Sequence, residues 1–195
     1  VRRSYSLKKS TGLMRALSPA EAAQGAAGIE FHAQKEYFRD TQNARTDSEW
    51  DTMWNIFCAQ AEPVMKGTFL RQGSTIFRVR NAYHSIDGFN IAETDQLDAD
   101  ALQEAVFTTS TLNLATDTMD GDNTAVPAVQ TDPSKYFQFR AEAESMLKIG
   151  DRMVFVPKAT INPKIGAEFT MLGAAWRVMT KASEGDAWAL LARMV

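Results

Sequence analysis

Cysteine is almost absent from this sequence, which has a single one, Cys58, among its 195 residues. A lone cysteine cannot form a disulfide within the chain, so secreted scaffolds stapled by disulfides are excluded and a reducing compartment is expected. We expect Cys58 to be buried by packing. Long hydrophobic runs are missing too: no stretch approaches the roughly 18 apolar residues of a membrane span, and the N-terminal region has no apolar run typical of a signal peptide. We therefore expect synthesis in a cytoplasm and no membrane association.

Residues that carry chemistry are scarce. His32 and His84 are the only histidines, and neither lies in a cluster with zinc-ligand spacing. Cys58 has no flanking basic residues to activate it as a nucleophile. Glu142 and Glu144 could act as paired carboxylates, but a solvated face is the default for such a pair. The sequence has no GxSxG, P-loop or GxGxxG motif. We therefore predict no catalytic residue, no metal site and no cofactor.

One acidic stretch resembles a calcium-binding loop in composition only. Asp117, Asp120 and Asp122 surround Gly121. An EF-hand loop with Gly121 as its sixth residue would end at Pro127, which cannot be the twelfth ligand. A solvated acidic turn is the expected structure.

The charges are distributed unevenly along the chain. Lysine and arginine total 21 and aspartate and glutamate total 24, which gives a net charge of −3. The first 20 residues carry +5 without an acidic residue, so the rest carries −3 − 5 = −8. Residues 1–17 are interpreted as a basic arm, whose candidate contact residues are Arg2, Arg3, Lys8 and Lys9. Three roles are open for this arm: gripping nucleic-acid phosphates with Tyr5 as a stacking ring, lying on the acidic body of another copy, or remaining a solvated tail.

Hydrophobic periodicity predicts many short strands and few helices. Residues 29–37 alternate with a period of two, which is typical of a strand with one wet face. Residues 50–59 fit a strand covered on both faces or a helical turn, and further strands are expected at 75–80, 88–93, 106–116, 136–140, 153–156, 174–180 and 187–193. Helices are expected at 18–27, 97–107 and, as a short patch, 141–148, and a long polar loop at 117–133. This pattern favours small β-barrels or sandwiches, because parallel α/β folds need a helical crossover between strands.

The sequence repeats itself at an offset of 99 residues. Gly67 corresponds to Gly166, Phe77-Arg78-Val79 to Trp176-Arg177-Val178, Asp87 to Asp186, and Phe89 to Trp188. This similarity predicts a tandem duplication, because the offset is close to half the chain length. The predicted organisation is an arm at 1–17, a first β unit with an N-terminal helix at 18–98, and a second β unit with the long loop at 99–195.

Each repeat is interpreted as a hairpin that begins at a glycine turn. Phe77 and Val79, like Trp176 and Val178, share one face of a strand, which predicts that they belong to the core. Phe89 and Trp188 begin the following strand. We expect the two aromatic residues of each repeat to pair across the hairpin as core anchors.

The second repeat resembles the C-terminal half of tailed-bacteriophage neck proteins, the head-closure or head–tail joining family. The resemblance rests on residues 150–155 (GDRMVF), on Gly166 with Phe169, on residues 172–178 (LGAAWRV) and on residues 190–193 (LLAR). In that family a GD strand start, a glycine turn, an aromatic-Arg/Glu-Val strand and a last strand with a basic end build a small β-barrel. The resemblance covers about 45 residues, and it extends to residues 50–95 only through the internal repeat.

The resemblance implies a structural virion protein without an active site, forming a ring in the neck between the portal and the tail. Its partners would be copies of itself, the portal or an adaptor, and tail proteins, with DNA passing through the ring. An acidic wall would let DNA slide, because tight DNA binding needs Lys and Arg. The chain is about twice the usual size for the family, so a tail or baseplate barrel is a second interpretation. A third is a single-stranded nucleic-acid-binding barrel with Phe77 and Trp176 as stacking platforms, and a fourth is an enzyme with an unrecognised site.

Overall fold

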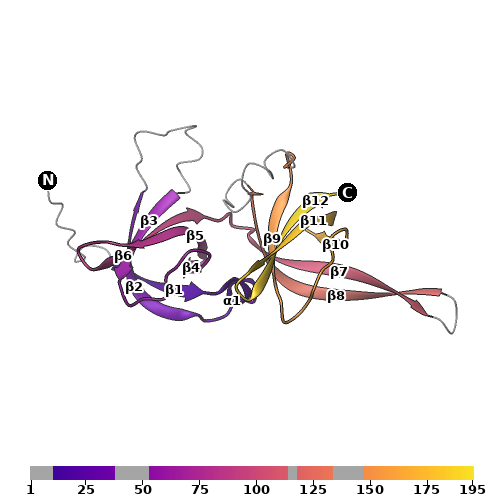
Figure 1. Cartoon of the computed structure of the whole chain (residues 1–195), viewed down its shortest axis with the longest axis horizontal. Coiled ribbons are helices and arrows are strands. Elements are labelled where there is room, and N and C mark those ends of the chain that lie inside the picture. The colour runs from indigo at the N-terminus through magenta and orange to yellow at the C-terminus, as the bar shows by residue number, and fades with distance from the viewer. Residues whose placement is uncertain (1–10, 38–52, 114–117, 134–146) are drawn as a thin grey trace. The chain divides into compact units, whose positions relative to one another are not determined.

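The computed structural model describes residues 11–37, 53–113, 118–133 and 147–195, which form twelve strands and one short helix (Figure 1). The chain divides into two compact units. Unit 1 comprises described residues within 1–18 and 27–99, and unit 2 those within 19–26 and 100–195. No helix in these ranges has the length and apolar character needed to cross a membrane.

Unit 1 is a closed barrel of six antiparallel strands. Its strands are β1 (Thr11–Leu17), β2 (Ile29–Tyr37), β3 (Met53–Ala59), β4 (Phe69–Gln72), β5 (Thr75–His84) and β6 (Phe89–Gln96). Their order around the barrel is β1-β2-β3-β6-β5-β4. The barrel closes where β1 pairs with β4, with Leu17 opposite Phe69.

Unit 2 is a second closed barrel with the same order of strands. Its strands are β7 (Leu102–Asn113), β8 (Thr118–Thr131), β9 (Arg152–Pro157), β10 (Glu168–Met171), β11 (Ala174–Glu184) and β12 (Ala187–Met194). The order β7-β8-β9-β12-β11-β10 reproduces that of unit 1 strand for strand. Here β10 closes the barrel on β7, and the rings of Phe107 and Phe169 stack with centroids 4.7 Å apart.

Backbone hydrogen bonds repeat at the offset of 99 residues. The N–H of Gly67 donates to the Val79 carbonyl at 3.0 Å, and the N–H of Gly166 donates to the Val178 carbonyl at 2.8 Å. Both glycines have a φ near +90°, at 87° and 88°, which favours glycine because it has no Cβ. Each barrel also has a β-bulge at the same place, between Val79 and Asn81 and between Val178 and Thr180. The predicted fold class, mainly β with two related barrel units, is confirmed.

Apolar side chains from alternate strand positions fill each barrel. The core of unit 1 contains Met14, Ala16, Phe31, Ala33, Ile56, Cys58, Val64, Leu70, Phe77, Val79 and Ala92. The core of unit 2 contains Ala105, Phe107, Val126, Ala128, Val154, Val156, Phe169, Met171, Trp176, Val178, Leu190 and Ala192. The two cores place large and small residues at different positions, so each barrel interior is filled by a different set of side chains.

The helix α1 (Pro19–Ala23) lies between β1 and β2 in the sequence but belongs to unit 2. It packs against β9 and β8, and Pro19, Ala20, Ala22 and Ala23 are buried. The N–H of Ala20 donates to the Asp186 carboxylate at 3.0 Å, which satisfies a free donor of the first turn. The predicted first unit with its own N-terminal helix is therefore wrong: the helix exists, but it covers the second barrel.

Three other predicted segments are wrong. Residues 11–17 of the expected arm form β1, which supplies Met14 and Ala16 to the core. The expected helix at 97–107 is absent: β7 begins at Leu102, and buried Ala105 and Phe107 alternate with exposed Glu104 and Thr108, a period of two. The expected loop at 117–133 is largely β8, which tolerates Pro127 because, among the described strands, none pairs with its outer edge until Val129.

Other predicted segments lie partly or wholly outside the described residues. Among the predicted strands, 136–140 lies outside them, and of the helical patch only residues 147 and 148 are described, in no helix. The segment interpreted as a strand or a helical turn is the strand β3 from Met53 onward. The short strands β4 and β10 were not expected.

Candidate interaction surface

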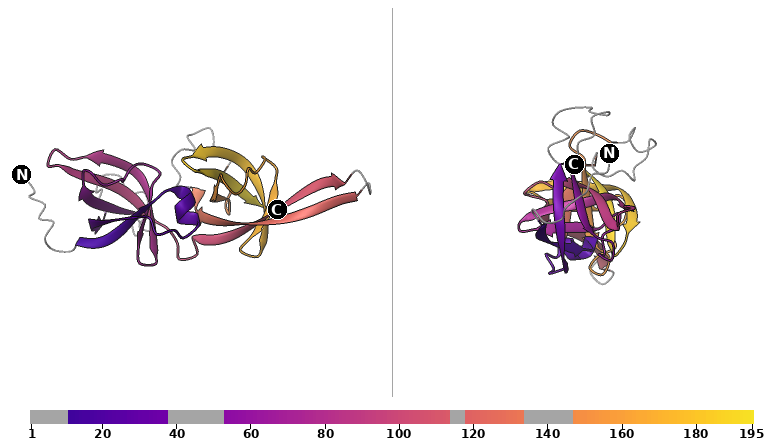
Figure 2. Two further views of the ribbon diagram at one scale, coloured as in Figure 1. Left: turned by 90° about the horizontal axis from the view of Figure 1, so that it is seen from below. Right: turned by 90° about the vertical axis from the view of Figure 1, so that its left-hand side faces the viewer.

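A β-ribbon projects from the barrel of unit 2. Residues 108–113 of β7 pair with residues 118–123 of β8, from Thr108 opposite Asn123 to Asn113 opposite Thr118. The neighbouring strands of the barrel pair with β7 and β8 only outside this segment. β10 pairs with β7 at Val106 and Phe107, and β9 pairs with β8 from Val129 onward. We call residues 108–113 and 118–123 the ribbon. Figures 1 and 2 show it extending away from its barrel as two strands with no third strand beside them.

The ribbon lies in a long stretch of sequence without a basic residue. From Arg80 to Lys135 there is no other lysine or arginine. The sequence of residues 108–123 contains Asp117, Asp120 and Asp122, and most of its other residues are threonine, serine or asparagine. The side chain of Asp122 is exposed. Of the three aspartates, Asp122 is the one whose side chain the structure describes.

Two lysines surround a tryptophan at one end of the same barrel. The Nζ atoms of Lys158 and Lys181 lie 4.9 and 4.3 Å from the centroid of the Trp188 ring, within cation–π distance. Lys158 donates to Ser183 Oγ at 2.6 Å, and Lys181 donates to Asn162 Oδ1 at 2.8 Å. We call Lys158, Lys181 and Trp188 the lysine–tryptophan mouth.

The β-bulge of β11 places Lys181 in this mouth. Val178 faces the core, so regular alternation would turn Thr180 inward and Lys181 outward. The bulge between Val178 and Thr180 reverses the alternation, and Lys181 then lies opposite the inward-facing Leu190. Trp188 is on the same face of β12, two residues before Leu190, and packs against the core. Bulges commonly re-aim a side chain in this way.

Both lysines of the mouth donate to neighbouring oxygens. Among the described residues, the polar partners of both ammonium groups are neutral oxygens, and neither has a carboxylate within ion-pair distance. The Nε1 atom of Trp188 is buried without a hydrogen-bond partner. Two positive charges therefore meet at one place, which favours negative charge nearby.

Unit 1 has a lysine–tryptophan contact at a different place, where Lys35 Nζ lies 4.3 Å from the centroid of the Trp54 ring. Two residues before the inward-facing Ala92 lies Asn90 instead of a tryptophan, and its Nδ2 donates to the Val64 carbonyl at 2.8 Å. The residue 99 positions before Lys181 is Ala82, partly buried against the core. Among the described residues, a lysine–tryptophan contact beside the bulge is therefore found in unit 2, and that of unit 1 lies between β2 and β3.

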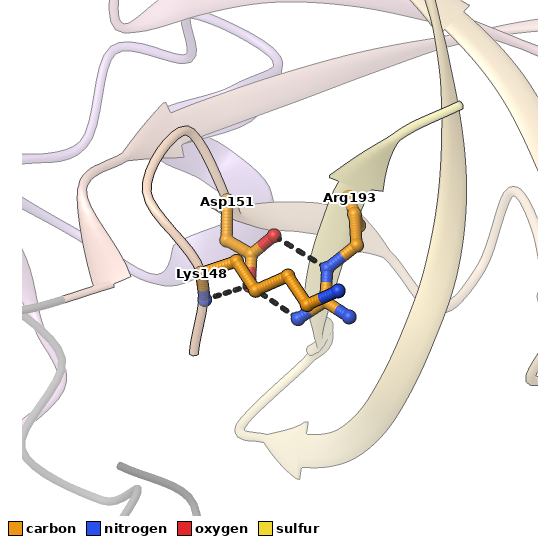
Figure 3. Close-up of polar contacts among 3 residues, drawn as sticks. All are labelled: Lys148, Asp151 and Arg193. Atoms are coloured by element: carbon orange, nitrogen blue, oxygen red, sulfur yellow. Dashed lines mark hydrogen bonds and ion pairs between the residues drawn. The ribbon is translucent and has the colours of Figure 1, made fainter. Parts of the chain in front are cut away.

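A buried ion pair holds the last strand of unit 2 (Figure 3). Asp151 accepts from Arg193 Nε and Nη2, both at 2.9 Å, and from the backbone N–H of Lys148 at 2.8 Å. Gly150, with a φ of 93°, makes the turn that directs this carboxylate at the strand β12. Burial alone would raise the pKa of Asp151, but the hydrogen bonds from Arg193 and Lys148 bring it below its ordinary value of 3.8. The role of this ion pair is therefore structural.

The residues singled out by the repeat have different surroundings. Phe77, Val79, Trp176 and Val178 are core residues, and Gly67 and Gly166 begin equivalent turns. Phe77 is fully buried and Trp176 is 3% exposed, so neither can stack on a nucleic-acid base. The expected pairing of aromatics across the hairpins is wrong: Phe77 lies opposite Gln96, and Trp188 lies opposite Ser183.

Phe89 and Trp188 are not equivalent, although they match at the offset of 99. Phe89 is three residues before the inward-facing Ala92 and so points outward, whereas Trp188 is two residues before Leu190 and points inward. The hairpins differ in length: four residues separate β5 from β6 and two separate β11 from β12. This difference shifts the last strand, and the sequence match alone does not reveal it.

The remaining candidate residues form no site. Cys58 is buried in the core of unit 1, and its burial, with Glu62 nearby, raises the pKa of the thiol to about 11. His32 and His84 are exposed. Across the described ranges no three His, Cys, Asp or Glu side chains could hold a metal ion. Arg2, Arg3, Lys8, Lys9, Asp117, Glu142 and Glu144 lie outside the described residues.

Sequence reasoning missed the lysine–tryptophan mouth. Trp188 stands out in the sequence as a repeat residue. Lys181 comes close to it because of the bulge in β11, and Lys158 because of the loop after β9. No protein-family model, curated protein or solved structure matches the chain.

Proposed function

We propose that this chain is a structural protein of a tailed-phage virion, forming a ring in the neck that joins the portal or head to the tail around the DNA channel. It would have no catalytic activity and no cofactor. Its partners would be copies of itself, the portal or an adaptor, and tail proteins. It would be made in the host cytoplasm and built into the particle.

The observation that carries this proposal is the contact between Asp151 and Arg193. The resemblance to neck proteins rests on a GD strand start and on a last strand with a basic end, which are 42 residues apart in the sequence. In the structure these two parts meet in one buried ion pair beside a glycine turn. The motif residues thus join the start of β9 to the end of β12 within a small barrel, which supports the proposal.

The duplicated barrel also supports a role in assembly. Each copy supplies two barrels and a ribbon that extends beyond one of them. A projecting element on one side of a subunit allows a head-to-tail contact, and head-to-tail contacts that close generate rings. The proposal needs no group of catalytic side chains.

Quantitative mass spectrometry of purified particles tests the proposal. We expect this chain at a copy number close to that of the portal and far below that of the major capsid protein. Its absence from particles would exclude the neck ring and the second candidate, a tail or baseplate barrel. A copy number well above that of the portal would favour the tail candidate.

A single-stranded nucleic-acid-binding module is the remaining alternative. The platforms expected for it, Phe77 and Trp176, are buried, so Trp188 beside Lys158 and Lys181 would have to replace them. Quenching of tryptophan fluorescence by single-stranded DNA in the wild type, and its loss in Trp188→Phe, would support it. Unchanged fluorescence at low salt would exclude it.

A further inference from the structure

We infer that unit 1 binds a phosphate group in a depression on the outer face of its barrel, between Arg15 and Arg71. The depression has a volume of about 300 Å³ and is lined by Leu13, Arg15, Glu30, Arg71 and Gly73. We call it the arginine depression. All five residues belong to unit 1, so the site goes beyond the proposed function and does not depend on it.

The two arginines come from the strands that close the barrel. Arg15 of β1 lies directly opposite Arg71 of β4. Their neighbours Ala16 and Leu70 belong to the core, so both arginines lie on the outer face of the barrel. Like charges directly opposite each other in a sheet are destabilising. An anion bound between the two guanidinium groups would remove this cost.

Glu30 balances one of the two positive charges. It lies opposite Arg15 on the other side of β1, and its carboxylate accepts from Arg15 Nη2 at 3.2 Å. Arg15 Nη1 also donates to the Ala27 carbonyl at 3.4 Å. A guanidinium has five N–H donors, so these two contacts orient Arg15 and leave it further donors for a ligand. Two arginines and one glutamate together carry +1, which a phosphodiester or another monoanion would neutralise.

The chemistry of the arginine depression suits phosphate. Guanidinium groups bind phosphate oxygens through paired N–H donors, and a tetrahedral phosphate group has enough oxygens to accept from two guanidinium groups at once. The volume is at the lower end of the range for small-molecule pockets, so it fits one phosphate group and a small part of the molecule that carries it. Leu13, which is 52% exposed, offers an apolar surface for that part.

The same place in unit 2 has no arginine. Thr170 is the residue 99 positions after Arg71 and lies opposite Val106 of β7. On its other side Val106 lies opposite Ala125 of β8. Threonine, valine and alanine therefore stand in the second barrel where two arginines and a glutamate stand in the first. Since the second barrel closes without these charges, they point to a role other than folding.

Substitutions taken from unit 2 test the site in the full chain. Arg15→Val and Arg71→Thr place in unit 1 the residues that unit 2 has at the same positions, so each variant should fold. Arg177→Thr is the control, because Arg177 is about half exposed on an outer strand of unit 2 and paired with Glu168. Arg71→Lys keeps the charge and loses the guanidinium fork, and it tests the site even where Arg71→Thr does not fold. Circular dichroism first checks the folding of each variant.

Titration with inorganic phosphate at constant ionic strength, followed by the amide chemical shifts in NMR spectra, measures binding. We expect saturable binding to the wild type and the control, with the largest shifts at residues 13–15 and 71–73. Binding should be at least about tenfold weaker in Arg15→Val and Arg71→Thr, and weaker in Arg71→Lys, because each variant loses charge-assisted hydrogen bonds. Absence of saturable binding to the wild type, or an equal loss in the control, would overturn the inference.

Two further titrations identify the source of the phosphate group. A DNA duplex that binds the wild type and loses about tenfold in affinity in Arg71→Thr would assign the site to the DNA backbone. Phosphate binding without DNA binding, or with DNA binding that the variants keep, would assign it to a small phosphorylated molecule. Acetate at the same ionic strength represents a carboxylate ligand. Acetate binding as tight as phosphate binding would overturn the inference in favour of an acidic protein segment.

Discussion

The guanidinium of Arg193 grips the carboxylate of Asp151 through two parallel hydrogen bonds of 2.9 Å. The aspartate side chain is 1% exposed and the arginine side chain 24%. Such a two-point contact fixes direction as well as distance, and it ties the turn before β9 to the end of β12. The C-terminal strand is thereby held at both its edges, by β11 and β9, and at its end.

Asp151→Asn should destabilise unit 2 by about 1–3 kcal/mol, because the buried hydrogen bonds lose the charge that strengthens them. Thermal unfolding followed by circular dichroism measures the change. Glu168→Gln is the matched control, since the Glu168–Arg177 pair is about half exposed and should contribute less than about 1 kcal/mol. Equal effects of the two substitutions would contradict the prediction.

The same ion pair should make unit 2 sensitive to acid. The pKa of Asp151 is lower in the folded chain than its ordinary value of 3.8. The pair therefore contributes stability above the unfolded pKa and loses it as the pH falls through the folded pKa. The difference in melting temperature between wild type and Asp151→Asn should be full at pH 7 and should shrink below about pH 4. A constant difference over this range would contradict the assignment.

Cys58 should be unreactive in the folded protein. The pKa of its buried thiol is raised to about 11, so little of the nucleophilic thiolate exists at pH 8. A thiol-reactive chromophore should label Cys58 only after denaturation. Val156 occupies the corresponding place in unit 2, since Cys58 lies opposite Asn90 and Val156 opposite Trp188. Cys58→Val should therefore cost less than about 1.5 kcal/mol, and rapid labelling of the native chain would refute the burial.

Phe77→Ala and Phe89→Ala should differ sharply, although the sequence repeat gave both residues the same role. Phe77 is fully buried in the core of unit 1, and its truncation should cost about 3–5 kcal/mol. Phe89 is partly exposed outside the core, and its truncation should cost about 1 kcal/mol. Urea denaturation of the two variants compares them directly, and a larger loss for Phe89→Ala would contradict the register of β6.

Leu172→Asn should stabilise the turn between β10 and β11 by up to about 1 kcal/mol. Leu172 has a φ of 55°, a left-handed backbone conformation that residues other than glycine and asparagine adopt at a cost in free energy. The residue 99 positions earlier is Gly73, with a φ of 60°. Leu172 is 46% exposed, so little packing is lost. A lower melting temperature for Leu172→Asn would show that the leucine has a packing role.

The repeat was readable in the sequence because its turns need glycine and its core needs large apolar residues. Gly67 and Gly166 keep the same φ, and Val79 and Val178 keep the same place beside the bulge. Strand alternation at 29–37 was readable for the same reason, since one face is buried and the other is wet.

What the sequence could not show depends on partners that are distant along the chain. β1 looks like an arm because Arg15 and Thr11 interrupt its apolar residues, and it becomes a strand only between β2 and β4. The ribbon looks like a loop because its sequence is mostly threonine, serine, asparagine and aspartate. Lys181 looks like a surface lysine until the bulge turns it toward Trp188.

The placement of α1 has a consequence for the order of events during synthesis. The helix emerges from the ribosome with the first strands of unit 1, but β8 and β9, against which it packs, are made much later. Unit 1 can close its barrel as soon as β6 has emerged, while residues 19–26 still await their partners. The second barrel is therefore assembled from strands that are synthesised last and from a helix segment that is synthesised before most of unit 1.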